Sequence, residues 1–176
     1  IITGVKLPGR REAVYPEREV KQYIRSLRAY IDMYTHDHYD FGLALRDDIP
    51  EIRALVADAT GGYVHTVPQD VMEAWIRKNP EVLHILRKGS ETMGYISMFP
   101  LPLDTILQRL SGKLLNRAIP IDDIQPFRPE TPYPLYVAEA AVKQHVPNSV
   151  RLGAMLLGHT EDLLVEYAKQ GVVFKE

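Results

Sequence analysis

The chain has 176 residues, of which 45% are hydrophobic and 25% charged, with a formal net charge of −2 and no cysteine, as is typical of a soluble globular domain. The lack of cysteine excludes disulfides, thiolate metal sites and a cysteine nucleophile, and it fits a cytoplasmic location. With no basic excess, no long apolar run and a polar start, the sequence predicts no nucleic-acid partner, no membrane contact and no signal peptide.

Residues 1–40 are predicted to form an N-terminal extension with one helix. Residues 1–15 show no periodicity, whereas residues 16–34 begin with a proline and place apolar side chains at helical spacing. This helix could pack on the rest of the chain, join a second copy in a homodimer, or connect to an upstream domain. His36 and His38 follow it without a third histidine nearby, so we predict a polar linker there and no metal site.

A strand and a helix open the predicted main domain, residues 41–176. Apolar residues at every second position of 41–45 predict a short strand. One of the two aspartates at 47–48 can cap a helix that has Pro50 in its first turn, and the glycine pair 61–62 can end it. The predicted inward face of this helix consists of Ile52, Leu55, Val56 and Ala59.

The rest of the chain alternates further strands and helices. The predicted elements are a helix bracketed by Pro68 and Pro80, a hairpin of 81–89 and 91–102, a helix at 103–116, a Pro-rich connection at 116–134, a strand at 135–144, a long helix from 149 and a last strand at 171–176. This order predicts a mixed α/β (α+β) fold with one central sheet flanked by helices. The strands on either side of the long helix should be parallel and joined by a right-handed crossover.

Three segments of the chain carry a resemblance to a known family. They are "RDDIPEIRAL" (46–55), "ETMGYISMF" (91–99) and "AAVKQHVPNSVRLGAMLL" (140–157), and together they resemble the GNAT acetyltransferase superfamily. The main motif of that family is a bulged strand, a loop of the type Gln/Arg-x-x-Gly-x-Gly/Ala, and a helix. Gly153 stands at the last glycine of the motif, while Asn148 replaces its first residue and Arg151 its first glycine. The resemblance implies a GNAT-like domain over 41–176 that lacks the family's last helix and strands.

The start of the long helix is a candidate anion site for reasons that do not depend on the family. The first turn of a helix leaves about four backbone N–H groups without intrahelical partners, and the helix dipole adds positive potential there. Asn148 or Ser149 can cap the helix, Arg151 adds a cation, and Gly153 allows close approach to the backbone. An ordinary helix cap is the alternative. The resemblance implies that the anion is the diphosphate of acetyl-CoA, held by Asn148, Ser149, Val150, Arg151, Leu152, Gly153 and Ala154.

The strand before this helix has two tasks that the resemblance implies. Its bulge frees the backbone of Ala141, Val142 and Lys143 to pair with the pantetheine arm. Glu139, two residues before that bulge, is the candidate general base, because acetylation requires a neutral amine. Alternation places the side chain of Glu139 on the same face of the strand as Val137 and Ala141, and that of Tyr136 on the other face. The alternative is that Glu139 simply faces solvent.

Other polar side chains are weaker candidates. We expect His84 to be a satisfied sheet residue rather than a base. Tyr63 and His65, between the first two helices of the domain, border the acceptor cleft by resemblance. Trp75 is expected in the core or in a cleft wall.

These observations predict an N-acyltransferase that transfers an acetyl group from acetyl-CoA, its co-substrate, to a primary amine of a small molecule or protein. The alternative is a catalytically inactive GNAT-like module of a larger protein that binds acyl-CoA or a partner. A third reading is an unrelated α/β domain whose loop is only a cap. No motif identifies the amine acceptor.

Overall fold

The computed structural model describes residues 5–6, 13–14, 21, 38–62, 66–129, 133–147 and 149–175. The chain divides into two compact units, residues 1–38 and 39–176. In the first unit, strands β1 (Val5–Lys6) and β2 (Ala13–Val14) pair in antiparallel fashion. The predicted helix 16–34 lies outside the described residues except for Lys21, which is helical, and His36 lies outside them as well.

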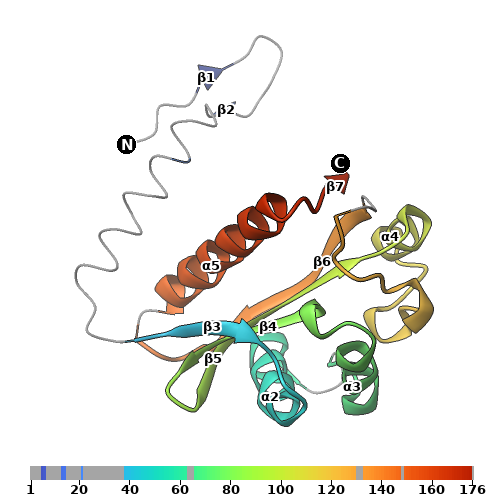
Figure 1. Ribbon diagram of the computed structural model, residues 1–176. Coiled ribbons are helices and arrows are strands. Elements are labelled where there is room, and N and C mark those ends of the chain that lie inside the picture. Colours follow the sequence, from blue (N-terminus) through green and yellow to red (C-terminus); the bar gives the residue numbers. More distant parts are fainter. Residues whose placement is uncertain are drawn as a thin grey trace. The chain divides into compact units, whose positions relative to one another are not determined.

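A five-stranded sheet forms the centre of the second unit, in the order β3-β4-β5-β6-β7 (Figure 1). The strands are β3 (Asp40–Leu43), β4 (Leu83–Lys88), β5 (Glu91–Pro100), β6 (Tyr133–Val142) and β7 (Phe174–Lys175). All neighbours are antiparallel except β6 and β7, which are parallel on either side of the long helix, as predicted.

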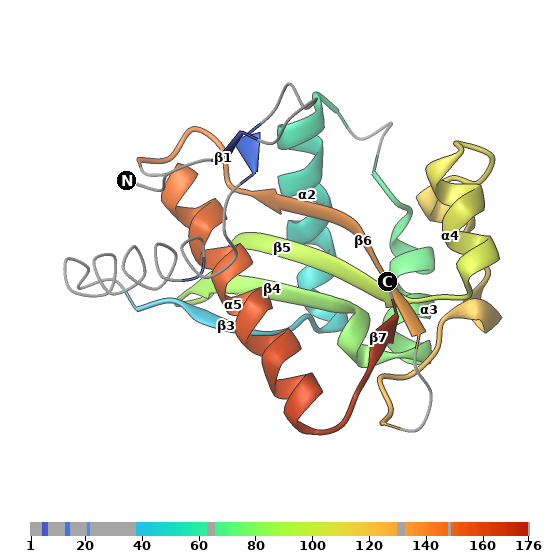
Figure 2. The same ribbon diagram turned by 90° about the horizontal axis from the view of Figure 1, so that it is seen from above.

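Helices cover both faces of this sheet. Helices α2 (Ile49–Thr60) and α3 (Gln69–Lys78) lie below the sheet in Figure 1, and α5 (Ser149–Lys169) lies above it. Figure 2, seen from above, shows α5 crossing in front of the strands. The order of strand, two helices, hairpin, insertion, strand, helix and strand is the predicted one. The mixed α/β fold, with a sheet flanked by helices, is therefore confirmed.

Two hydrophobic clusters hold the layers together. The cluster beneath α2 and α3 includes Trp75, which is 2% exposed and meets the Phe99 ring edge-on at a centroid distance of 4.9 Å. The cluster beneath α5 contains Leu86, Met93, Ile96, Met98, Leu152 and Leu156. Because each cluster belongs to one face, the cluster that a β-strand side chain joins shows which way that side chain points.

The ends of α2 follow the predicted signals, but its cap and its inward face differ in detail. Pro50 lies in the first turn, and Gly61 ends the helix with a left-handed φ of 79°. Asp48 makes no cap bond to α2. Its carboxylate instead accepts bonds of 2.6 Å from the Leu45 N–H and the Arg87 guanidinium. Ala59 is exposed and Ala57 buried in its place, which corrects one position of the predicted face.

The insertion between β5 and β6 contains less helix than predicted. Helix α4 (Leu103–Leu110) stops at Ser111 and Gly112, and Gly112 has a left-handed φ of 74°. Short 3-10 helices occur at η1 (Arg46–Asp48), η3 (Pro80–Val82), η4 (Asn116–Ala118) and η5 (Ile121–Asp123). The buried side chain of Asn79 donates to the Gln125 carbonyl at 2.7 Å and so ties this connection to the end of α3. Within the described ranges, no helix has both the length and the apolar content needed to cross a bilayer.

Candidate functional site

Strand β6 carries a bulge at its middle rather than near its end. Val137 lies opposite Met98 and Glu139 lies opposite Ser97, so Ala138 is the extra residue. The predicted bulge near Ala141 was therefore placed too late. The alanines on both sides of Glu139 look alike in sequence, and only the register with β5 distinguishes them.

The bulge changes which side chains share a face. Tyr136 and Ala138 pack against the cluster beneath α2 and α3, as Ala141 does beyond the bulge. Glu139 lies on that same face, because it contacts Tyr95 of the same cluster. Simple alternation wrongly placed Tyr136 on the other face and grouped Glu139 with Val137. One wall of the sheet therefore carries both Tyr136 and Glu139.

Glu139 is partly buried and has a hydrogen-bond partner on the neighbouring strand. The hydroxyl of Tyr95, on β5, donates to Oε2 of the Glu139 carboxylate. Ser97 Oγ donates to the backbone carbonyl of Glu139 at 3.3 Å. Burial, with the nearby Glu139 carboxylate, raises the pKa of Tyr95 well above its usual value. The Tyr95 hydroxyl therefore stays protonated at neutral pH and acts as a donor.

Among the described residues, β7 pairs with the outer edge of β6 at Tyr133 and Pro134 and not further along the strand. The Lys143 N–H donates to the Met93 carbonyl of β5 at 2.8 Å. By antiparallel alternation, the backbone groups of Ala141 also point toward β5, and those of Ala140 and Val142 point to the outer edge. Of the three residues predicted to meet pantetheine, Val142 alone has this orientation.

The first turn of α5 contains a cation, Arg151, that is only partly satisfied. Its side chain is partly exposed, yet Nε and Nη2 are buried, and no hydrogen-bond partner among the described residues reaches them. Val150, in contrast, is 87% exposed, and Leu152, at 2%, anchors the turn in the core. Ser149 begins the helix. Asn148 lies outside the described residues.

The glycines 94 and 153 differ in what surrounds them. A Cβ added at Gly94 would lie 3.1 Å from Val142 Cγ1 and 3.3 Å from the Ala141 carbonyl, so tight packing against β6 explains that glycine. A Cβ added at Gly153 would meet nothing within 4 Å. Packing therefore does not explain the glycine in the first turns of α5.

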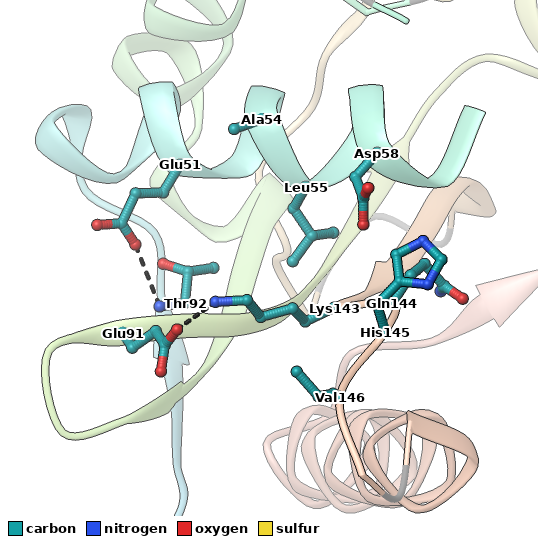
Figure 3. A pocket seen from close by; sticks show the side chains of 10 residues that line it. All are labelled: Glu51, Ala54, Leu55, Asp58, Glu91, Thr92, Lys143, Gln144, His145 and Val146. Atoms are coloured by element: carbon teal, nitrogen blue, oxygen red, sulfur yellow. Dashed lines mark hydrogen bonds and ion pairs between the residues drawn. The ribbon is translucent and has the colours of Figure 1, made fainter. Parts of the chain in front are cut away.

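A cavity of about 550 Å³ lies at the end of the sheet, between α2 and the loop that joins β6 to α5 (Figure 3). In this view α2 runs across the top and α5 is seen end-on below. The cavity is lined by Glu51, Ala54, Leu55, Asp58, Glu91, Thr92, Lys143, Gln144, His145 and Val146. The sequence did not reveal this cavity, because its walls come from three segments far apart in the chain.

Charge makes this cavity a poor place for phosphates. Three of its lining residues are carboxylates, and its lysine, Lys143, forms an ion pair with Glu91. Glu51 accepts a bond from the Thr92 N–H at 3.1 Å. His145 has a φ of 56°, the one left-handed residue other than glycine in the described part of the chain. These carboxylates disfavour an anionic ligand in the cavity.

His84 lies on the α5 face, away from Glu139. Its ring stacks on Phe41 at 5.4 Å, and Phe41 stacks on His159 of α5 at 5.5 Å. His84 is 2% exposed, and no described residue offers its Nδ1 a hydrogen-bond partner, so it is a buried sheet residue but not the satisfied one that was expected. Burial lowers its pKa to about 4. Tyr63 and His65 lie outside the described residues. Among the residues that the structure describes, no cluster of three potential metal-binding side chains occurs.

His84 should make the folded state sensitive to acid. Its pKa is depressed from 6.5 to about 4, so the unfolded chain binds the proton more readily. Stability is then full above pH 6.5 and falls as the pH drops toward 4, by about 3 kcal/mol in the limit. Urea unfolding at pH 7.5 and 4.5 should show a smaller acid loss for His84→Phe than for wild type. His159→Gln is the control and should lose as much stability in acid as wild type. If His84→Phe also loses as much as wild type, the acid sensitivity belongs to other groups.

Comparisons with known proteins give distant structural likenesses. No protein-family profile matches the chain, and no curated protein matches it in sequence. A structure described as ribosomal-protein-alanine N-acetyltransferase from Brucella melitensis biovar Abortus 2308 is similar over 79% of this chain and 80% of its own, with 15% identity and a TM-score of 0.43. A second, described as an acetyltransferase, is similar over 70% and 73%, with 15% identity and a TM-score of 0.40.

Proposed function

We propose that this chain is a GNAT-type N-acyltransferase that moves an acetyl group from acetyl-CoA to a primary amine of a small molecule or protein. The observation that carries the proposal is the guanidinium of Arg151 at the start of α5, whose buried Nε and Nη2 find no hydrogen-bond partner in the part of the chain that the structure describes. A buried charge is costly unless it is paired. A bound diphosphate would supply the missing acceptors and would also meet the unpaired amides of the first turn.

The open space at Gly153 supports the same ligand. A phosphate group that accepts bonds from helix amides must come close to the backbone, and the absence of a side chain at Gly153 allows this. Ser149, Val150 and Arg151 would contribute their backbone N–H groups, as Asn148 would if it follows the family motif. Leu152 and Ala154 come later in α5, where the backbone N–H groups bond to carbonyls four residues back.

The pantetheine arm would then follow the outer edge of β6. We assign the pairing to the backbone of Ala140 and Val142, which points away from β5. The Val142 carbonyl at present accepts a bond from Gln144 Nε2 at 2.9 Å. An amide of the pantetheine arm would replace that side chain, so Gln144 has to turn away when acetyl-CoA binds.

Glu139 is proposed as the general base. Its carboxylate takes a proton from the substrate ammonium, and the neutral amine attacks the thioester carbonyl. The C–N bond forms as the C–S bond breaks, and the thiolate of coenzyme A leaves with the second proton released by the amine nitrogen. Alignment of the amine and the thioester supplies much of the remaining rate.

Thermal unfolding with and without acetyl-CoA tests this function. At 100 times its dissociation constant, a ligand that binds only the folded chain adds about 2.7 kcal/mol, which raises Tm by a few degrees. Turnover should follow with some member of an amine panel. An unchanged Tm at millimolar acetyl-CoA would contradict the proposal.

The second candidate is a catalytically inactive module that binds acyl-CoA. The identity of residue 151 favours this candidate. Arg151 stands where the family motif has its first glycine, and it strengthens anion binding without adding to catalysis. A rise in Tm without turnover of any amine would support this module. The cytoplasmic location and the homodimer stay predictions from the sequence.

A further inference from the structure

We propose that Tyr95 is a positioning residue that holds the carboxylate of Glu139 in the orientation needed to deprotonate the amine. This inference rests on the proposed function, since it assigns a role within the same site. The proposal adds Tyr95, on the neighbouring strand β5, to a site whose proposed general base, Glu139, lies on β6. Tyr95 itself need not touch either substrate.

The geometry of the sheet makes this contact specific. Tyr95 lies directly opposite Ala141 on β6, and Glu139 lies opposite Ser97. The Tyr95 hydroxyl therefore reaches Glu139 along the diagonal between neighbouring strands, a separation that a tyrosine side chain can span. Tyr95 is only 2% exposed and belongs to the main core cluster, so its ring cannot swing away.

One oxygen of the carboxylate is occupied and the other is left available. Tyr95 bonds to Oε2 of Glu139, and no donor in the described part of the chain reaches Oε1. Because burial keeps the Tyr95 proton in place, the hydroxyl always acts as the donor and the carboxylate as the acceptor. The carboxylate is thereby fixed in rotation, with Oε1 as the atom that accepts the substrate proton.

A purely structural role is the competing explanation, since a buried tyrosine hydroxyl needs a partner. A second pair in the same chain shows what such a role looks like. The hydroxyl of Tyr167, on α5, donates to Oε1 of Glu81 at 2.9 Å, and Tyr167 is 6% exposed. Glu81 lies in a 3-10 turn before β4 and not at the bulge of β6. This pair provides a matched control for the loss of a tyrosine–glutamate bond.

Tyr95→Phe removes only the hydroxyl and keeps the ring in the core. We expect kcat to fall about tenfold with KM for acetyl-CoA unchanged. A tyrosine with a purely structural role would not lower kcat while KM stays the same. Tyr167→Phe, the matched control, should leave both kcat and KM unchanged. An unchanged kcat in Tyr95→Phe would overturn the positioning role.

A double variant keeps the test valid if Tyr95→Phe also lowers stability. If Tyr95 acts through Glu139, adding Tyr95→Phe to Glu139→Gln should lower kcat no further. A further tenfold loss in the double variant would overturn the proposal, because Tyr95 would then act by another route. Wild-type protein that binds no acetyl-CoA would contradict the proposed function itself, whereas normal binding and turnover in the wild type with an unchanged kcat in Tyr95→Phe would contradict only the role of Tyr95.

Discussion

Glu139→Gln is expected to lower kcat by about 10²- to 10⁴-fold, the usual range for losing a general base. Glutamine has nearly the same shape, and its amide oxygen can still accept the bond from Tyr95. What it loses is the ability to take a proton at neutral pH. The fold and the affinity for acetyl-CoA should therefore change little, and the remaining turnover should require a higher pH, at which more of the amine is already neutral.

The measurement is a pH–rate profile of Glu139→Gln beside a thermal shift with acetyl-CoA. Glu161→Gln, an exposed glutamate on α5, is the control and should behave as wild type. Full activity in Glu139→Gln with an unchanged pH profile would remove Glu139 from the role of base. The site at the β6 bulge would then need another proton acceptor, and His84 is not one, because it faces the opposite side of the sheet.

Gly153→Ala is expected to raise stability and weaken binding of coenzyme A at the same time. Alanine is favoured over glycine in a helix by about 0.8 to 1 kcal/mol, and the added Cβ meets nothing within 4 Å. The same methyl group stands where a phosphate must approach the backbone. We expect the dissociation constant of coenzyme A to rise about tenfold or more, equivalent to about 1.4 kcal/mol.

Because stability is expected to rise while the affinity for coenzyme A falls, misfolding of the variant cannot explain the predicted result. Calorimetric titration gives the affinity, and thermal unfolding of the free protein gives the stability. Leu157→Ala, at a 61% exposed position later in α5, serves as the control and should not affect the affinity. A Gly153→Ala protein with a higher Tm and an unchanged dissociation constant would place the diphosphate elsewhere.

Local signals predicted most of the elements because they act within a few residues. Pro50 marks the start of α2 and Gly61 its end. Gly89, between β4 and β5, has the positive φ of 61° that a tight hairpin requires. Helix α4 ended early for an equally local reason, at Gly112. The sequence carried these features, and the correct order of strands and helices followed from them.

The site itself was only partly predictable, because its geometry arises between segments. Nothing in "AEAA" marks Ala138 as the bulged residue, since the register with β5 decides it. The contact between Tyr95 and Glu139 joins residues 44 positions apart. Burial of Arg151 without a partner and the open space at Gly153 also depend on the packed fold. The sequence thus indicated the residue types, and the structure supplied their neighbours.

A titration followed by NMR tests the central claim most directly, that the start of α5 holds the diphosphate of coenzyme A. The full chain, labelled with ¹⁵N, is titrated with coenzyme A and, separately, with pantetheine, which lacks the diphosphate. The account predicts that the Arg151 Nε–H and the backbone amides of residues 149–153 shift with coenzyme A and not with pantetheine. Signals at these positions that stay unchanged at saturating coenzyme A would contradict it.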